Sequence, residues 1–160
     1  KFRFPATYIT FLRHPVARTI SQYKEWLRNR PERLLNQDGS TQSLIESIKS
    51  CPDNYTDFQC NHIAPRNNES GLSIGEKALN NLTDYFSGVG LVEYFDESIS
   101  LFSKKLGWVV KPYNKLNVKN TKVEISAELI ELILSINQND LFLYESVKEQ
   151  FLKEFEKYIK

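Results

Sequence analysis

Three side chains near the start of the chain have the types and spacing needed to hold an anion. Arg13 ends an apolar run in the stretch FLRHPVARTISQYKEW, residues 11–26. On a helix, His14, Arg18 and Ser21 are spaced by four and three residues and share one face. A guanidinium matches phosphate oxygens with two charge-assisted hydrogen bonds, and a hydroxyl adds a donor. The alternative is that Arg13 pairs with a carboxylate and Ser21 faces solvent.

The elements expected around these residues would bring them together. Residues 7–12 are β-branched, aromatic and mostly apolar, which is typical of a buried parallel strand. Pro15 suits the first position of a helix, whose apolar side chains recur at helical spacing: Val16, Ile20, Tyr23 and Leu27. Arg13 would then follow the carboxyl end of a strand, where α/β sheets bind ligands. The positive end of the helix dipole would face the same place.

The rest of the chain alternates helices with one further buried strand. Apolar spacing, caps and glycines predict these elements: a helix over 42–50, a helix opened by a capping box at 73–76, a strand over 88–92, a helix capped by Asp96 and ended by Gly107, and helices capped by Ser126 and Asp140. Residues 51–71 are predicted to form a long irregular loop, which usually has a function. The pattern indicates an α/β fold with a parallel sheet flanked by helices. Two strands are few, so we expect residues 1–160 to be part of a single domain.

Composition argues against several classes of function. The 21 Lys and Arg balance 20 Asp and Glu to a net charge of +1, so overall charge gives no argument for nucleic acid or a membrane as partner. No apolar run approaches the roughly 18 residues of a transmembrane span. Histidines and cysteines lack zinc-ligand spacing, so we expect no metal site. Cys51 and Cys60 form a disulfide or stay reduced, which leaves the compartment open.

The stretch FLRHPVARTISQYKEW resembles the 3′-phosphate-binding segment of sulfotransferases that use 3′-phosphoadenosine-5′-phosphosulfate (PAPS). It is most similar to the carbohydrate and glycosaminoglycan sulfotransferase group. In that family a strand ends in Arg, followed by Asp-Pro and a helix with an Arg and a Ser, the Ser eight residues after the first Arg. Five residues fit this pattern: Arg13, Pro15, Arg18, Ser21 and Tyr23. His14 replaces the commoner acid, and we interpret it as a weak helix cap.

The resemblance extends over nearly the whole chain. GVGLVEYFDESISLFSKKLGW, residues 88–108, resembles the second strand and following helix of the group. LNVKNT and ISAELIELILSINQNDLFLY, residues 116–121 and 125–144, resemble its C-terminal part. The resemblance implies a P-loop-NTPase-like sulfotransferase fold.

It also implies the residues that bind the nucleotide. By this resemblance Arg13 and Ser21 bind the 3′-phosphate, with Arg18 adding charge. The loop around Lys119 and Asn120 would close over the same nucleotide.

Other parts of such an enzyme are missing from the sequence. The family grips the 5′-phosphosulfate with an upstream P-loop, but no G-x-x-x-x-G-K-[ST] motif and no Gly-Lys pair occur here. We therefore expect the N-terminal strand, the P-loop and the usual catalytic base to be absent, because the chain is the C-terminal part of a longer protein or a degenerate relative. His62 is the candidate base within the chain, and a histidine that packs in the loop is the alternative. Tyr55, His62 and Arg66 are the candidates for acceptor contact.

The implied function is transfer of a sulfuryl group from PAPS, as co-substrate and without a metal, to a hydroxyl acceptor that we expect to be a carbohydrate. This segment supplies the 3′-phosphate site and is expected to be inactive alone. The alternatives are a non-catalytic interaction module that retains the fold, and a relative of the P-loop kinases.

Overall fold

The computed structural model describes residues 6–64, 71–113 and 122–159. These residues form a mixed α/β structure that is mostly helical: β1 (Ile9–Leu12), α1 (Pro15–Asn29), α2 (Leu44–Ser50), α3 (Phe58–Ile63), α4 (Ile74–Tyr85), β2 (Gly88–Leu91), α5 (Phe95–Leu106), α6 (Ala127–Ile136) and α7 (Gln138–Ile159). Short 3-10 helices are η1 (Pro31–Leu34), η2 (Pro52–Asn54) and η3 (Val92–Tyr94). The α/β class expected from the sequence is confirmed.

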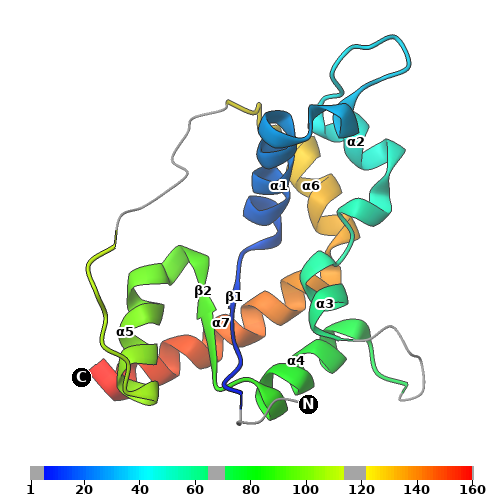
Figure 1. Cartoon of the computed structure of the whole chain (residues 1–160). Coiled ribbons are helices and arrows are strands. Elements are labelled where there is room, and N and C mark those ends of the chain that lie inside the picture. Colours follow the sequence, from blue (N-terminus) through cyan, green and yellow to red (C-terminus); the bar gives the residue numbers. More distant parts are fainter. Residues whose placement is uncertain (1–5, 65–70, 114–121, 160) are drawn as a thin grey trace.

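The two strands form a small parallel sheet, with Ile9 opposite Gly88 and Leu12 opposite Leu91. Both lie within the ranges predicted from their apolar residues. The longest helix, α7, crosses the molecule behind the strands and contacts α3, α4 and α5 along its length (Figure 1).

Two glycines let aromatic rings lie directly on β2. A Cβ added to Gly90 would stand 2.6 Å from the Phe11 ring, and one added to Gly88 would stand 2.6 Å from the Phe102 ring. Phe11 comes from β1 and Phe102 from α5, so their rings can approach the β2 backbone only because no side chain intervenes. The glycines therefore set the distance between α5 and the sheet.

The buried apolar side chains of the described residues form two clusters. One surrounds the sheet and includes Leu12, Leu91, Leu143 and Phe151. The other lies between α1, α2 and α6, which are neighbours in Figure 1, and is built around Tyr23, with the further buried members Ile20, Trp26, Leu34, Leu44, Ile48, Tyr55, Leu129 and Ile133. Helix α1 thus buries the face opposite to its polar residues, as its spacing predicts.

The prediction of an irregular loop over 51–71 is wrong for its described part, which contains η2 and α3. Helix α3 has six residues, too few for its own hydrogen bonds to stabilise it in water. Its formation therefore depends on contacts with other parts of the chain.

Two aspartates from distant segments supply those contacts by capping each other's helix. The Asp140 carboxylate accepts backbone N–H bonds from Gln59 and Cys60 at 3.0 and 2.8 Å, at the start of α3. Asp57, which precedes α3, accepts the backbone N–H of Asn139 and Asp140 at 3.0 and 3.1 Å, at the start of α7. The prediction that Asp140 caps its own helix is wrong, because α7 begins at Gln138.

The other predicted caps divide into two groups. The hydroxyls of Ser73 and Ser126 each accept a backbone N–H from the first turn of the following helix, as predicted. The predicted cap at Asp96 is wrong, because α5 begins at Phe95 and Asp96 lies within its first turn. An acid is favoured at either position by the helix dipole, so the sequence does not separate them.

The two cysteines are free thiols, which decides between the alternatives left open by the sequence. Cys51 is exposed, whereas Cys60 is buried in α3. Burial, followed by the nearby Asp140 carboxylate, raises the pKa of the Cys60 thiol. Cys60 is therefore held as a neutral thiol.

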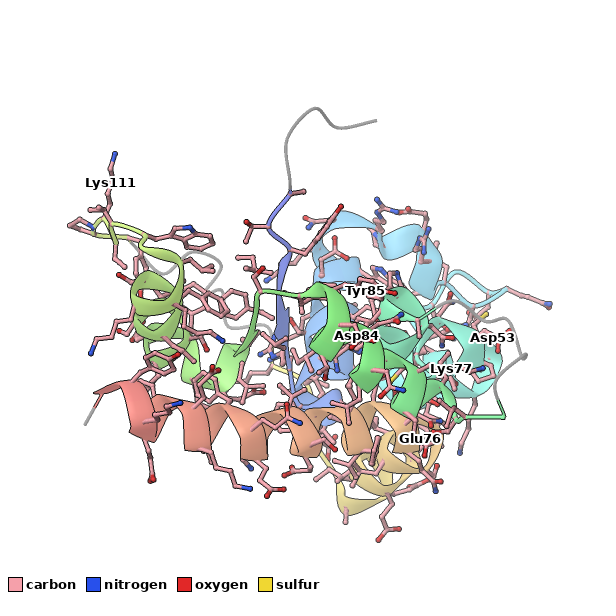
Figure 2. All side chains as sticks on the ribbon, turned by 90° about the horizontal axis from the view of Figure 1, so that it is seen from below. Asp53, Glu76, Lys77, Asp84, Tyr85 and Lys111 are labelled. Atoms are coloured by element: carbon pink, nitrogen blue, oxygen red, sulfur yellow. The ribbon has the colours of Figure 1, made fainter. Side chains whose placement is uncertain are left out.

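In the view of Figure 2, the long helix α7 runs past α5 and α4, and Lys111, which follows α5, projects away from them. None of the helices in residues 6–64, 71–113 and 122–159 combines the length and apolar character needed to cross a membrane.

Candidate anion-binding site

Arg13, Arg18 and Ser21 line one surface depression of about 500 Å³, together with Gln22, Glu25, Trp26, Arg33 and Phe58. Arg13 directly follows β1, and Arg18 and Ser21 come from the first turns of α1. Phe58 on the opposite side belongs to α3. The fold thus places the three predicted side chains around one space. Lys119 and Asn120 lie outside the described residues.

Arg13 is held through its backbone, and its guanidinium has no partner among the described residues. The backbone N–H of Arg13 donates to Oε1 of Gln59 at 2.8 Å, and its carbonyl accepts Nε2 of Gln59 at 2.9 Å. Among the described residues, nothing hydrogen-bonds its side chain, and its Nε is buried. A half-buried cation with unused donors is unusual, because buried polar groups are normally paired.

Arg18 is fixed by contacts on both sides of its guanidinium. Nη1 donates to Oε1 of Gln22 at 2.6 Å and Nη2 donates to the Tyr55 carbonyl at 3.2 Å. Cζ stands 4.2 Å from the centroid of the Phe58 ring, in a cation–π contact. The Nε of Arg18 is buried and has no partner within the described part of the chain.

The electrostatic state of Arg18 suits an anion. Burial lowers its pKa to about 10, and Asp140 opposes that shift. Arg18 therefore keeps its charge at neutral pH but has lost part of its hydration. In the described ranges neither Arg18 nor Arg13 forms an ion pair with a carboxylate. A bound anion could supply acceptors for donors of the two side chains that have no partner among the described residues.

The depression changes character along its length. Arg13, Arg18 and Ser21 form a cationic end with a hydroxyl. At the other end Glu25 contributes a carboxylate, and Cζ of Arg33 stands 5.3 Å from the Trp26 ring centroid. The anion is therefore expected at the first end, away from Glu25.

His14 does not belong to the depression and does not cap the helix with its side chain. Its backbone N–H donates to Glu93 at 3.0 Å, and its ring packs edge-on against Tyr144 with centroids 5.3 Å apart. His14 is the N-cap residue of α1, as interpreted from the sequence, and its carbonyl accepts the backbone N–H of Arg18 at 2.9 Å. Its side chain makes no capping bond, because the ring packs against Tyr144 of α7 instead. Burial, followed by Glu93, raises the pKa of Tyr144.

His62 lies in the last turn of α3 rather than in a loop. Its ring stacks on Phe58 with centroids 4.1 Å apart, and Nδ1 is 2.7 Å from the Phe58 carbonyl oxygen. It borders the depression only through Phe58. Tyr55 is fully buried and bonds to Ser47 at 2.6 Å, so the prediction that it contacts an acceptor is wrong. Arg66 lies outside the described residues.

Sequence analysis missed Gln22, Phe58 and Gln59. Gln22 stands four residues after Arg18, a spacing that places their side chains side by side on a helix, and this signal was present. Phe58 and Gln59 gave no comparable signal, because they lie in a segment without apolar periodicity.

The site can bind and orient an anion through guanidinium groups and a hydroxyl. Within the described residues, no three His, Cys, Asp or Glu side chains are grouped to hold a metal ion. No protein-family model matches the chain, and no curated protein matches it either.

Proposed function

We propose that this chain is the 3′-phosphate-binding part of a PAPS-dependent sulfotransferase with the P-loop-NTPase-like fold of that family. The enzyme transfers a sulfuryl group to a hydroxyl, with a carbohydrate as the acceptor. One observation carries the proposal: the guanidinium of Arg13, which has no partner in residues 6–64, 71–113 and 122–159, shares a depression with Arg18 and Ser21 at the carboxyl end of a parallel strand.

In the proposed reaction these residues contact the nucleotide rather than sulfur, as the resemblance to the family implies. The acceptor oxygen attacks sulfur, the bond between sulfur and the 5′-phosphate oxygen breaks, and adenosine 3′,5′-bisphosphate leaves. The acceptor proton passes to a base. Arg13, Arg18 and Ser21 hold the 3′-phosphate and so orient the donor for in-line attack. The phosphate oxygens accept from guanidinium groups that the protein leaves underused.

Selective stabilisation by nucleotides tests the proposal. Adenosine 3′,5′-bisphosphate at 100 times its dissociation constant should add about 2.7 kcal/mol to stability, or several degrees in Tm. ATP and adenosine 5′-phosphate should add much less at the same concentration. Equal shifts for the three nucleotides would remove the sulfotransferase proposal and favour a kinase relative. No shift for any of them would favour an interaction module.

Two variants locate the effect. Arg13→Ala should abolish the selective shift, because it removes the whole unpaired guanidinium. Ser21→Ala should weaken binding about fivefold, as expected for one hydrogen bond of ordinary strength. Arg28→Ala is the matched control, since Arg28 is an exposed arginine at the end of the same helix. An equal loss in Arg28→Ala would mean that general charge, rather than this site, binds the nucleotide.

A further inference from the structure

Two consecutive residues of α3 contact the two arginines of the anion site. Gln59 joins both backbone groups of Arg13 through its side-chain amide, at 2.8 and 2.9 Å. It thereby acts as one more pairing residue beyond the end of β1 and fixes the peptide from which the Arg13 side chain extends. Residues 13 and 59 are 46 apart in the sequence, so this bond also ties α3 to the strand.

Phe58 fixes the second arginine. Its ring lies 4.2 Å from Cζ of Arg18, and it also packs against the His62 ring. The carbonyl of Tyr55, three residues earlier, accepts a hydrogen bond from the same guanidinium. The Phe58 ring therefore packs on the face of the Arg18 guanidinium, and the Tyr55 carbonyl accepts a hydrogen bond from its edge. A planar guanidinium can stack its face on a ring and donate hydrogen bonds from its edge at the same time, whereas an ammonium has no planar face to stack.

The position of α3 is set by hydrogen bonds with the start of α7. Asp140 is fully buried and caps α3, while Asp57 caps α7 in return. Asp57 takes a left-handed backbone conformation with φ of 41°, which non-glycine residues rarely adopt. The junction therefore holds α3 in one place, in spite of its short length.

We propose that Phe58 and Gln59 are positioning residues of the anion site: Gln59 sets the start of the Arg13 side chain and Phe58 sets the plane of the Arg18 guanidinium before an anion binds. The identity of the anion in this inference rests on the proposed function. The claim that Phe58 and Gln59 hold the two arginine side chains in place does not rest on it. Ordering the side chains in advance lowers the entropy lost on binding.

Affinity for adenosine 3′,5′-bisphosphate, measured by calorimetry, gives the first test. Phe58→Leu keeps an apolar side chain but loses the aromatic face, and affinity should fall about tenfold, within the range of a partly buried cation–π contact. Phe58→Tyr keeps the face and should bind within about twofold of the parent. Unchanged affinity in Phe58→Leu, or equal losses in both variants, would overturn the role of Phe58.

Spectra of protein labelled with 15N in arginine, recorded without ligand, give the second test. The buried Nε–H groups of Arg13 and Arg18 should exchange slowly with solvent. Phe58→Leu should remove the protection of Arg18, and Phe58→Tyr should keep it. Gln59→Met has a similar length but no hydrogen bonds, and it should remove the protection of Arg13. Gln150→Met, at an exposed position of α7, is the matched control.

The two tests separate two kinds of failure. If both signals stay protected in Phe58→Leu and Gln59→Met, the positioning inference is wrong whatever nucleotide binds. If the variants lose protection as expected but the parent prefers none of the nucleotides, the proposed function is wrong and the positioning inference stands. Dispersed backbone amide signals in every variant confirm that each has folded.

Discussion

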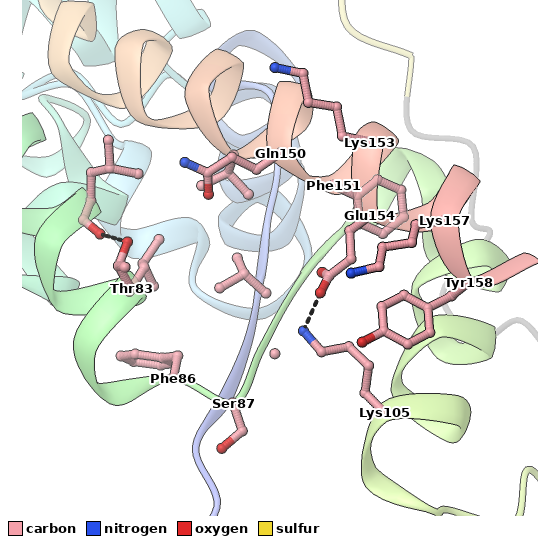
Figure 3. A pocket seen from close by; sticks show the side chains of 15 residues that line it. Thr83, Phe86, Ser87, Lys105, Gln150, Phe151, Lys153, Glu154, Lys157 and Tyr158 are labelled. Carbon is pink, nitrogen blue, oxygen red and sulfur yellow. Dashed lines mark hydrogen bonds and ion pairs between the residues drawn. The ribbon is translucent and has the colours of Figure 1, made fainter.

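The two ends of the parallel sheet carry depressions of similar volume, about 500 Å³ beyond the carboxyl end of β1 and about 510 Å³ beside the amino end of β2. Cationic side chains border both. At the amino end these are Lys105, Lys153 and Lys157, which Figure 3 shows together with Phe151; Leu82 also lines this depression. Charge alone would make either depression a candidate for binding an anion.

The partners of the cations distinguish the two ends. Lys105 pairs with Glu154 at 2.7 Å, Lys153 pairs with Glu149 at 2.6 Å, and Lys157 lies over the Tyr158 ring at 5.9 Å. Helices α4, α5 and α7 all end near this depression, where lysines offset the negative ends of their dipoles. The fold itself therefore accounts for these lysines.

At the carboxyl end the arginines keep donors that the fold does not use. Arg13 has no side-chain partner among the described residues, and Arg18 retains a buried Nε–H. Buried donors without a partner are uncommon in native proteins, and a bound ion is one of the arrangements that satisfies them. The comparison teaches that donors left without a partner in the described residues, rather than the number of positive charges, distinguish the two depressions, which is why the anion is proposed at the carboxyl end.

The largest effect should come from the aspartate that supports the carboxyl end. Asp140→Ala leaves two backbone N–H groups of α3 without a partner in a buried place, so the free energy of unfolding should fall by about 3 kcal/mol. Glu154→Ala, at the amino end, should cost less than about 1 kcal/mol, because its ion pair is partly exposed. Urea denaturation measures both values. Equal losses of unfolding free energy in the two variants would contradict the difference drawn between the two ends of the sheet.

An intermediate effect should follow from exchanging the type of cation at each end. Arg18→Lys keeps the charge but loses the planar contact with Phe58 and the bonds to Gln22 and Tyr55, so affinity for adenosine 3′,5′-bisphosphate should fall about tenfold. Lys105→Arg should leave the affinity unchanged. Calorimetric titration of both variants tests this. Weaker binding in Lys105→Arg would mean that the nucleotide binds in the depression at the amino end of β2, which would contradict the proposal.

The smallest effect should come from removing a lysine at the amino end. Lys105→Met should lower the free energy of unfolding by less than about 1 kcal/mol, and the loss should shrink further as salt screens the pair with Glu154. Thermal unfolding at low and high salt measures the difference. A loss above 2 kcal/mol, independent of salt, would show that Lys105 has a role beyond this ion pair.

The sequence predicted the parts of this arrangement that depend on nearby residues. The strand before Arg13, the proline at the helix start and the spacing of Arg18 and Ser21 are all local, and each is found as expected. Hydrophobic periodicity and helix propensity act over a few residues, which is why such features can be read directly.

The parts that hold the site could not be predicted in this way. Gln59 bonds to Arg13 across 46 residues, and Asp57 bonds to Asp140 across 83. Helix α3 is stabilised by these distant partners, and its local sequence lacks the apolar periodicity that would predict a helix. The same limit explains the misplaced caps, because an aspartate near a helix start can serve its own helix or another one.

The mutual capping of α3 and α7 has a consequence for biosynthesis. A ribosome releases the chain from its N-terminus, so Arg13 and Arg18 emerge long before Asp140. Until Asp140 appears, α3 lacks its cap, and Phe58 and Gln59 have no fixed place beside the arginines. Until α7 has been made, the nascent chain therefore carries Arg13 and Arg18 without the contacts from α3 that hold them in the folded protein.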